Sequence, residues 1–504
     1  MNPLTSSRSH ADPSVANAIP FGFSRNKGVL AASLEEGIYE LWIKKSLCDP
    51  LALAEARRIL GRPIKVIRIE DTEFDKALEI AYTSGSSSGV YGEVMEQIER
   101  DGVLSKMAED LPATRDLLES GGEAPVIRLV NDLLAHALKD KASDIHIEPY
   151  ESKSVIRVRV DGVMADILTF KPALHASLVS RIKIMANLDI DVKRIPQDGR
   201  VSIRLAGQPV DIRVSTLPAA YGERVVLRLL DKKEAILSLG SLGMNQDIRN
   251  TLEDMLLHPH GMLLVTGPTG SGKTTTLYSA LGRMDLKRRN IMTVEDPIEY
   301  NLEGISQTQV NPAIGLTFAK ALRSILRQDP DVVMIGEIRD LDTARIATQA
   351  SLTGHLVLAT LHTNDSISAV TRLVDLGVEP YLIASTLLGS MAQRLVRRLC
   401  LKCKKKKELS RDEMKFPHTS AREEWTSTGC DECNNIGYRG RTGVFEMMQV
   451  DEKTRALIHE GASETKLRDH IIKKNGMTVL MQDTMRLVEE GVTSYEEVIR
   501  AMES

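Results

Sequence analysis

The chain has few aromatic residues, no long apolar run, no signal-peptide pattern and no net positive charge. Each of these features argues against a class of structure or function. Aromatic residues make up only 4% of the 504 residues, so the hydrophobic cores must be aliphatic. No apolar run approaches the roughly 18 residues of a membrane-spanning helix, so no such helix is expected. The N-terminus lacks a basic start followed by an apolar run, which predicts no signal peptide. The formal net charge of −4 argues against bulk nucleic-acid binding, which usually needs a basic domain.

Cysteine is also scarce, and its placement favours metal binding over disulfides. Cys48 is solitary, and we expect it to be a packed core residue. The other four form two close pairs, Cys400 with Cys403 and Cys430 with Cys433. In a chain without an export signal this arrangement is typical of a metal site, and the expected compartment is the cytosol.

The rest of the composition is that of an ordinary globular protein, with 42% hydrophobic and 27% charged residues. The chain is too long for one core, so roughly two to four domains are expected. Changes in composition and periodicity divide it. We predict a disordered lead (1–18), a small α+β domain (19–83), a linker and helical connector (84–122), a second α+β domain (123–233), a domain of alternating strands and helices (242–395), a cysteine module (396–440) and a helical C-terminal region (441–504).

The segment 242–395 has the clearest fold pattern. Four short apolar runs are predicted as strands separated by helices: Met262–Thr266, Ile291–Val294, Val332–Ile335 and Leu356–Ala359. Such alternation implies a mostly parallel sheet covered by helices, which is an α/β fold. Upstream, Pro125–Lys139 carries a helical apolar stripe, and the residues after it alternate as strands do.

Residues Gly267 to Thr274 fit the phosphate-binding pattern G-x-x-x-x-G-K-[ST]. Glycines let backbone N–H groups turn inward around phosphate oxygens, and the following helix adds its dipole. Lys273 is expected to reach the β- and γ-phosphates, and the Thr274 hydroxyl to bind Mg²⁺. The predicted nucleotide-binding residues are Gly267, Pro268, Thr269, Gly270, Ser271, Gly272, Lys273, Thr274 and Thr275.

Two acidic residues follow predicted strands of the same sheet. Glu337 ends the run Val332–Glu337, where a carboxylate can hold Mg²⁺ or activate the attacking water. Glu295 comes just past Ile291–Val294 and is a second candidate for the general base. The alternative for each is a solvated surface acid.

Two histidines flank the run Leu356–Ala359. His362 lies at its C-terminal end and is a candidate sensor of the γ-phosphate. His355 lies at the opposite end, where a catalytic and a purely structural role are equally open.

Together these motifs resemble one family, the secretion ATPases of the type II/type IV pilus class. The segments that carry the resemblance are Ser143–Pro149, Pro196–Arg200, the phosphate loop, Thr293–Glu299, Val332–Arg339, Thr353–Asp365 and the cysteine pairs. Phe21–Ser24, the small first domain and Gly437–Gly443 favour the type II secretion ATPases, the general secretion pathway E proteins. The resemblance covers roughly residues 20 to 504.

The resemblance implies a fold, an assembly and further site residues. It implies a RecA-like ATPase domain, a PAS-like second domain and a homo-hexamer with ATP between these two domains. Arg213 and Arg228 match family arginines of the second domain, and Arg323 and Arg327 match a pair after the acidic box. Guanidinium groups are the expected stabilisers of charge on transferring phosphoryl oxygens. Without the resemblance, the second-domain pair would be only the solvated face of a sheet.

The resemblance also implies partners and a cellular location. The first domain would dock on the cytoplasmic part of an inner-membrane secretion protein, and an inner-membrane platform protein would receive the motion. The chain would lie in the cytoplasm at the inner membrane, where hydrolysis drives pseudopilus assembly and protein export. The alternatives are a type IV pilus extension ATPase, a DNA-translocating motor and a nucleotide-gated scaffold with little turnover.

The two C-x-x-C pairs offer four thiolates, which suits a closed, structural, tetrahedral Zn²⁺ site. The alternative is four reduced thiols without a metal. Lys402 and Lys404–Lys407 form a basic run beside the first pair. This run could touch anionic lipid headgroups or the acidic tail of a partner, although a solvated loop is the interpretation we favour.

Overall fold

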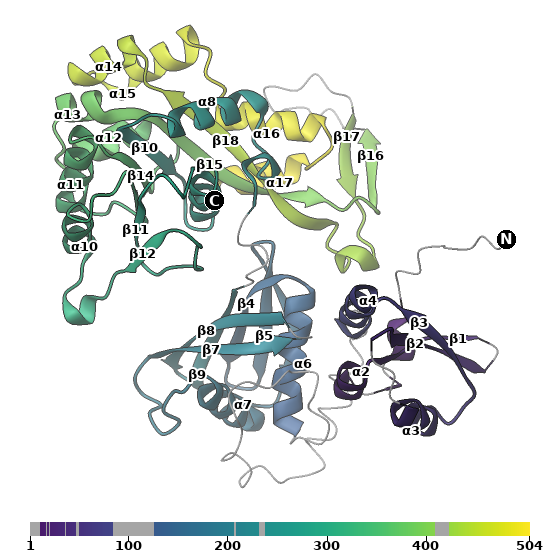
Figure 1. Ribbon diagram of the computed structural model, residues 1–504. Coiled ribbons are helices and arrows are strands. Elements are labelled where there is room, and N and C mark those ends of the chain that lie inside the picture. Colours follow the sequence, from purple (N-terminus) through teal and green to yellow (C-terminus); the bar gives the residue numbers. More distant parts are fainter. Residues whose placement is uncertain are drawn as a thin grey trace. The chain divides into compact units, whose positions relative to one another are not determined.

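The structure of the protein is a computed structural model. It describes residues 11–16, 18–19, 21–35, 37–46, 50–83, 125–205, 208–230, 237–408 and 423–503. The chain divides into two compact units, Met1–Lys232 and Lys233–Ser504 (Figure 1). The predicted linker and helical connector and Cys48 lie outside the described residues.

The first part of the chain contains a three-stranded sheet with helices. Its elements are α1 (Pro13–Ala16), α2 (Phe21–Lys27), β1 (Val29–Glu35), β2 (Ile38–Lys44), α3 (Pro50–Leu60), β3 (Ile64–Ile69) and α4 (Asp71–Thr83). The strand order is β1-β2-β3, with β1 antiparallel and β3 parallel to β2.

The expectation of a disordered lead over residues 1–18 was wrong for residues 11–16. Ala11 and Ala16 are buried in the core of this part. The Asp12 N–H donates to the Ala32 carbonyl at 2.7 Å, and the Asp12 carbonyl accepts from Ala16 at 2.9 Å. The small side chains of Ala11 and Ala16 pack in the same core as residues of β1. Tertiary contacts therefore order a segment whose composition predicts disorder.

A six-stranded antiparallel sheet follows. Its elements are α6 (Pro125–Lys139), β4 (Ala142–Pro149), β5 (Ser154–Val160), β6 (Val163–Phe170), α7 (Pro172–Met185), β7 (Gln197–Leu205), β8 (Gln208–Ala219) and β9 (Gly222–Leu230), with strand order β6-β5-β4-β9-β8-β7. Burial alternates along β9, and buried residues of α6 and α7 share one core with the sheet. One face of the sheet is therefore covered, and the other carries polar side chains.

The second unit is built on a seven-stranded, mostly parallel sheet of order β12-β11-β13-β14-β10-β15-β18 (Figure 1). The strands are β10 (Gly261–Thr266), β11 (Ile291–Glu295), β12 (Ser306–Gln309), β13 (Val332–Ile335), β14 (Leu356–Leu361), β15 (Leu387–Leu399) and β18 (Tyr438–Gln449). The helices are α8 (Gln246–Leu256), α9 (Lys273–Leu281), α10 (Phe318–Ile325), α11 (Leu341–Leu352), α12 (Ser368–Asp375), α13 (Pro380–Thr386), α14 (Glu452–His459), α15 (Glu464–Arg468), α16 (Leu480–Glu489) and α17 (Tyr495–Glu503). Only the β15–β18 pair is antiparallel in this sheet.

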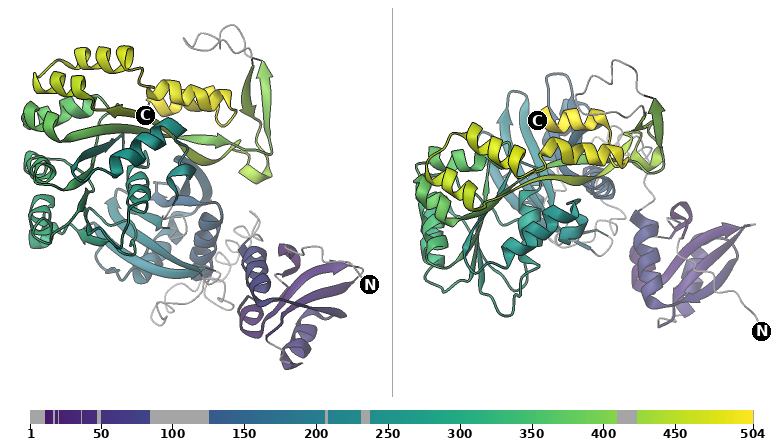
Figure 2. Two further views of the ribbon diagram at one scale, coloured as in Figure 1. Left: turned by 45° about the horizontal axis from the view of Figure 1, so that its top comes forward. Right: turned by 90° about the horizontal axis from the view of Figure 1, so that it is seen from above.

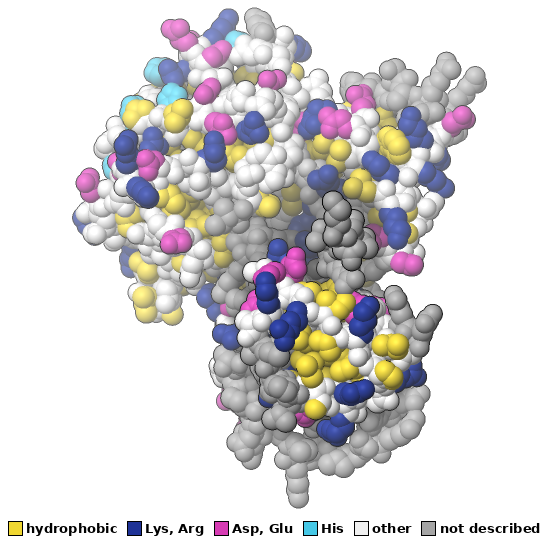
Figure 3. Space-filling model, turned by 45° about the vertical axis from the view of Figure 1, so that its right-hand side comes forward, with side chains coloured by type: hydrophobic (Ala, Val, Ile, Leu, Met, Phe, Trp, Pro, Cys, Tyr) yellow, Lys and Arg dark blue, Asp and Glu magenta, His cyan; other side chains and the backbone are white. Residues whose placement is uncertain are grey.

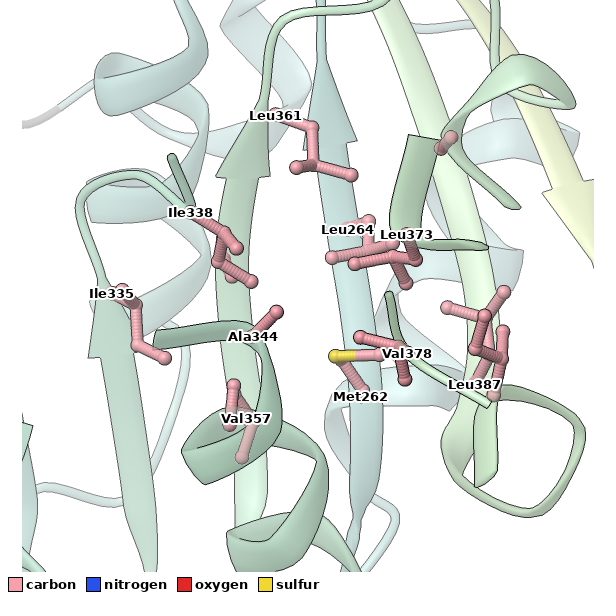
Figure 4. Packing of buried hydrophobic residues seen from close by; sticks show 14 of the residues in the cluster. Met262, Leu264, Ile335, Ile338, Ala344, Val357, Leu361, Leu373, Val378 and Leu387 are labelled. Atoms are coloured by element: carbon pink, nitrogen blue, oxygen red, sulfur yellow. The ribbon is translucent and has the colours of Figure 1, made fainter. Parts of the chain in front are cut away.

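The central strands are buried on both faces, which explains why their sequences are unbroken apolar runs. Along β10, Met262 and Leu264 belong to one core, whereas Leu263 and Val265 belong to the core on the opposite face. Figure 4 shows the first core, where Leu264 lies with other aliphatic side chains of the sheet and its covering helices. The four predicted strands of this sheet are confirmed, each to within about two residues.

The expectation that residues 441–504 are helical is corrected for residues 441–449, which belong to β18. Strand β15 likewise runs across the expected boundary at residue 395. The cysteine region is therefore an excursion between two paired strands of the main sheet. It contains the hairpin of β16 (Lys404–Glu408) and β17 (Glu423–Ser427). The start of β18 is rich in arginine and glycine, a composition typical of a loop. Its buried part lacks the alternation of apolar and polar residues by which a strand is recognised in a sequence.

The C-terminal helices are fixed to β15 and β18 by buried acids. Asp483 of α16 accepts from the Phe445 N–H at 2.9 Å, and Glu497 of α17 accepts from the Arg397 N–H at 2.8 Å. In both views of Figure 2, α16 and α17 lie along these two strands. Because both carboxylates are fully buried, their hydrogen bonds are needed to offset the cost of desolvation.

We predict that Leu264→Ala destabilises the second unit by about 2–5 kcal/mol, because it leaves a cavity in the central strand. Leu257→Ala is the matched control, since Leu257 is 73% exposed and its loss should change stability by less than about 0.5 kcal/mol. Calorimetric unfolding of both variants measures the difference. Equal stabilities would contradict the assignment of Leu264 to the core.

Candidate nucleotide and metal sites

The phosphate loop connects the end of β10 to the start of α9, as the motif requires. Gly267, Gly270 and Gly272 have φ values of 147°, 81° and 89°, a region that side chains disfavour. A Cβ on Gly267 would lie 2.5 Å from the Gln393 carbonyl oxygen, and one on Gly272 would lie 2.8 Å from Gln393 Nε2. Glycine is therefore required both by backbone conformation and by the close approach of β15.

The loop presents donors and a cation on its inner side. The first helical hydrogen bond of α9 runs from the Thr276 N–H to the Gly272 carbonyl, so the N–H groups of the first helical turn, Lys273 to Thr275, have no partner within the helix and can bind an anion. Lys273 Nζ donates to the carbonyls of Gly267 at 2.7 Å and Pro268 at 2.9 Å. Burial lowers the pKa of Lys273 to about 8, and the nearby Glu337 carboxylate opposes this shift.

The remaining loop residues differ in exposure. Thr269 and Gly270 are exposed, whereas Thr274 and Thr275 are half-buried at the start of α9. The buried Ser271 hydroxyl has no hydrogen-bond partner among the described residues. An unpaired buried hydroxyl in a loop of this kind fits a site that closes around a polar ligand.

Glu337 and His362 lie together beside Lys273. Glu337 follows β13 and forms an ion pair with Arg339. His362 follows β14, and its Nε2 lies 3.6 Å from the Glu337 carboxylate. Burial of the imidazole, together with the charge of Lys273, lowers the pKa of His362, so the neutral ring is favoured. The sheet thus brings three residues that are far apart in sequence to one edge.

Glu295 has a different environment from Glu337. It is buried at the end of β11, and its carboxylate accepts hydrogen bonds from Tyr278, from Thr293 at 2.5 Å and from Gln307 at 3.1 Å. No cation pairs with it in the described part of the chain. All three partners are neutral, whereas Glu337 faces Arg339, Lys273 and His362.

The loop after β14 is tied to the phosphate-loop strand. The Thr363 N–H donates to Thr266 Oγ1 at 2.8 Å, and the two hydroxyls are 2.6 Å apart. Buried Arg394 donates to the carbonyls of Asn364 at 3.0 Å and Gln393 at 3.1 Å.

Arg394 and Gln393 were not predicted from the sequence. Gln393 contacts the helix that follows the phosphate loop, because Thr276 Oγ1 donates to Gln393 Oε1 at 2.8 Å. Neither residue belongs to a motif that spacing alone would identify.

The arginines implied by the family resemblance fall in both units, and only Arg323 and Arg327 share a unit with the phosphate loop. Arg323 and Arg327 are exposed on or just after α10, and Arg327 donates to the Arg323 carbonyl at 2.9 Å. In the first unit, Arg213 and Arg228 line a cavity of about 380 Å³ together with Arg200. Arg228 is also hydrogen-bonded to Asp144 at 2.9 Å.

His355 lies at the opposite end of β14 from His362. Its Nδ1 is 2.9 Å from the Ala350 carbonyl, and its own carbonyl accepts from the Gly261 N–H. These contacts join α11 to the start of β14 and β10, which is a structural role.

The four cysteines predicted to bind metal form one cluster. Their sulfur atoms all lie within 4.8 Å of one another, and neighbouring pairs are 3.7–3.8 Å apart. Four sulfurs placed about 2.3 Å from a tetrahedral Zn²⁺ ion would be about 3.8 Å apart. Cys433 Sγ also accepts from the N–H groups of Cys430 at 3.3 Å and Gly437 at 3.2 Å. The donor set and its spacing therefore fit zinc.

Comparison with known proteins identifies the family. The family described as "Type II/IV secretion system protein" matches residues 119–500, and a domain family described under "GSPII protein E" matches residues 18–82. The chain belongs to the type II/IV secretion system proteins.

Relatives in this family share about half of their residues with the chain. The type II secretion system protein E of Klebsiella pneumoniae is 50% identical over 488 residues, covering 96% of this chain and 97% of the relative. The type II secretion system ATPase E of Vibrio cholerae is 50% identical over 453 residues, 89% of each chain. The type II secretion system protein HxcR of Pseudomonas aeruginosa is 52% identical over 450 residues, 89% of this chain and 92% of the relative.

Solved structures support the same fold. The ATPase DotB of Legionella pneumophila matches with a TM-score of 0.56 at 21% identity, over 78% of this chain and 97% of that one. The pilus retraction motor PilT with bound ADP matches with a TM-score of 0.51 at 26% identity, over 73% and 95%. The predicted fold class is confirmed: a RecA-like P-loop domain follows two small α+β domains and is joined to a four-cysteine cluster and C-terminal helices. Among the described helices, none combines the length and apolar character needed to cross a bilayer.

We predict that the purified chain carries about one Zn²⁺ ion, because the four sulfurs match the size of that ion. Cys430→Ser should lower the metal content strongly and destabilise the excursion between β15 and β18. Elemental analysis by mass spectrometry measures the stoichiometry, and Cys48→Ser is the matched thiol control. An unchanged zinc content in Cys430→Ser would contradict the assignment.

Proposed function

We propose that this chain is a cytoplasmic ATPase that hydrolyses MgATP to drive pseudopilus assembly and protein export through a type II secretion system. The observation that carries the proposal is the meeting of Lys273, Glu337 and His362 at a complete phosphate loop. The identity of about 50% with type II secretion E proteins over nearly the whole chain supports the biological setting.

The phosphate loop would bind the ATP phosphates through its N–H groups, with Lys273 on the β- and γ-phosphates. Thr274 and Glu337 would hold Mg²⁺, which supplies neutralisation of phosphate charge when bound. Lys273 donates its hydrogen bonds to two loop carbonyls, so ATP binding would exchange these contacts for charge-assisted ones. The neutral His362 can donate one hydrogen bond toward the γ-phosphate side of the site.

The two acids would share the remaining work. Glu337 lies close to Lys273 of the phosphate loop, which favours a role in holding Mg²⁺ beside the bound phosphates. Glu295 has only neutral partners in the described chain, and we assign it the activation of the attacking water. An alternative is that Glu337 performs both roles.

The arginines would act in an assembled homo-hexamer. Arg323 and Arg327 are exposed in the single chain, so they are available to a site on a neighbouring copy. Arg213 and Arg228 line a cationic cavity that suits phosphate oxygens. Hydrolysis would then change the angle between the second domain and the ATPase domain and pass the motion to the membrane partners.

The partners would be membrane proteins and anionic lipid. The first domain, which matches the GSPII protein E domain family, would dock on the cytoplasmic domain of an inner-membrane secretion protein. The motion would reach an inner-membrane platform protein, and the exposed lysines of β16 would face lipid headgroups. A pull-down with the full chain, and with a control chain lacking residues 19–83, separates type II secretion from pilus extension. Capture of a secretion membrane protein by the full chain alone favours type II secretion, and capture of a pilus membrane protein favours pilus extension.

A DNA-translocating motor is opposed by the charge of the molecule. The formal net charge is −4, and acidic and basic side chains are interspersed over the face shown in Figure 3. DNA-stimulated hydrolysis would instead favour that function, and absent steady-state phosphate release from the hexamer would favour a scaffold.

We predict that Lys273→Ala lowers kcat at least about 100-fold, because a charge aimed at the transferring phosphoryl group is lost. Lys287→Ala is the matched control, since Lys287 is an exposed lysine away from the loop. Steady-state phosphate release measures the effect in vitro, and export of secreted proteins measures it in cells. Full turnover by Lys273→Ala, with an intact fold, would rule out the proposed function.

We predict different defects for the two acids. Glu337→Gln should raise the Mg²⁺ concentration needed for half-maximal activity, whereas Glu295→Gln should lower kcat roughly 100-fold or more with little effect on MgATP binding. Magnesium titrations and fluorescent-nucleotide binding separate the two outcomes. The reverse pattern would exchange the assigned roles.

A further inference from the structure

Tyr278 forms the most direct link between the phosphate-loop helix and Glu295. It lies on α9, which begins at Lys273, and its ring is only 1% exposed. Its hydroxyl donates to Glu295 Oε2 at the end of β11. One side chain therefore connects the element that would hold phosphate to the acid assigned as the base.

The other carboxylate oxygen of Glu295 is fixed by residues of two neighbouring strands. Thr293 of β11 and Gln307 of β12 lie directly opposite each other in the parallel ladder, and both donate to Glu295 Oε1, at 2.5 and 3.1 Å. Gln307 also donates to the Tyr300 carbonyl at 3.2 Å and to the Tyr278 hydroxyl at 3.3 Å, and it accepts from the Leu302 N–H. Tyr278 is therefore the donor that comes from outside the β11–β12 pair.

The direction of the Tyr278–Glu295 hydrogen bond is defined by chemistry. Burial and the hydrogen bond to the carboxylate raise the pKa of Tyr278 above its ordinary value, so the phenol keeps its proton and donates. The hydroxyl cannot be supplied by phenylalanine, although the ring packing can. A purely structural aromatic residue at this position would not need the oxygen.

We propose that Tyr278 is a positioning residue for hydrolysis: its hydroxyl holds the Glu295 carboxylate at a fixed place relative to the phosphate loop. This inference rests on the proposed role of Glu295 as the base. A general base must lie within hydrogen-bond reach of its water, and misplacement by about 1 Å can cost a factor of roughly 100 in rate. The hydrogen bond from Tyr278 couples that distance to the position of α9.

The same cluster offers a matched control. The Tyr300 ring meets the Tyr278 ring edge-on at 4.7 Å, but its buried hydroxyl has no hydrogen-bond partner among the described residues. Tyr300→Phe therefore removes an oxygen from the same environment without removing a hydrogen bond. Any effect of a lost phenol group on packing alone should be equal in the two variants.

The test compares kcat, KM for ATP and fluorescent-nucleotide affinity for Tyr278→Phe, Tyr300→Phe and the unaltered full-length hexamer, at a temperature where melting curves show all three folded. We expect kcat of Tyr278→Phe to fall roughly 10- to 100-fold, with KM and nucleotide affinity within about twofold of the unaltered protein. Tyr300→Phe should stay within about twofold in every quantity.

Two results would overturn the inference. One is a kcat for Tyr278→Phe equal to that of Tyr300→Phe; the other is a parallel loss of kcat and nucleotide affinity, which is the mark of a structural role. Glu295→Gln distinguishes the inference from the proposed function. Inactive Glu295→Gln with fully active Tyr278→Phe overturns only the positioning role, whereas active Glu295→Gln overturns the assignment of the base and the positioning role with it.

Discussion

The parallel pairing of β10, β11, β13 and β14 is the constraint on which the rest of the second unit depends. Because these strands run in one direction, the residues that follow them emerge at the same edge. The phosphate loop, Glu337 and His362 meet there although they are far apart in sequence. A parallel sheet needs cover on both faces, and the alternating side chains of β10 supply it by entering two separate cores. The common direction of the strands therefore brings the site residues together, and the parallel sheet is stable because both of its faces are buried.

The same edge concentrates charges that water would otherwise solvate. Lys273 is buried with its pKa lowered to about 8, and two loop carbonyls hold its ammonium. Glu337 is balanced by Arg339, and the imidazole of His362 is favoured in its neutral form by a lowered pKa. This arrangement favours an anion, because a cation and backbone donors lie together at this edge of the sheet. Glu295, in contrast, accepts hydrogen bonds from three neutral donors.

The sequence predicts those parts of the site that have a local cause. The spacing of the glycines in Gly267–Thr274 reflects backbone conformation within one turn, so the loop could be recognised without any structure. Glu337 and His362 could be placed because each lies within two residues of the end of an apolar strand. Gln393 could not be predicted as a loop contact, since it is distant in sequence and approaches Gly267 only through the pairing of β10 with β15. Tyr278 could not be predicted either, because it belongs to no motif and only its tertiary partner reveals the use of its hydroxyl.

Strands β15 and β18, which extend beyond the domain boundaries expected from the sequence, determine how the second unit is connected. Strand β15 carries Gln393 close to the phosphate loop, Arg397 against Glu497 of the C-terminal helix α17, and Leu399 next to Cys400 of the cysteine cluster. One continuous strand therefore joins the nucleotide site, the C-terminal helices and the cysteine cluster. The Thr276–Gln393 hydrogen bond ties α9 to this strand from the other side. A displacement of β15 relative to the loop must break that bond or carry α9 with it, so these parts of the unit are mechanically coupled to the phosphate loop.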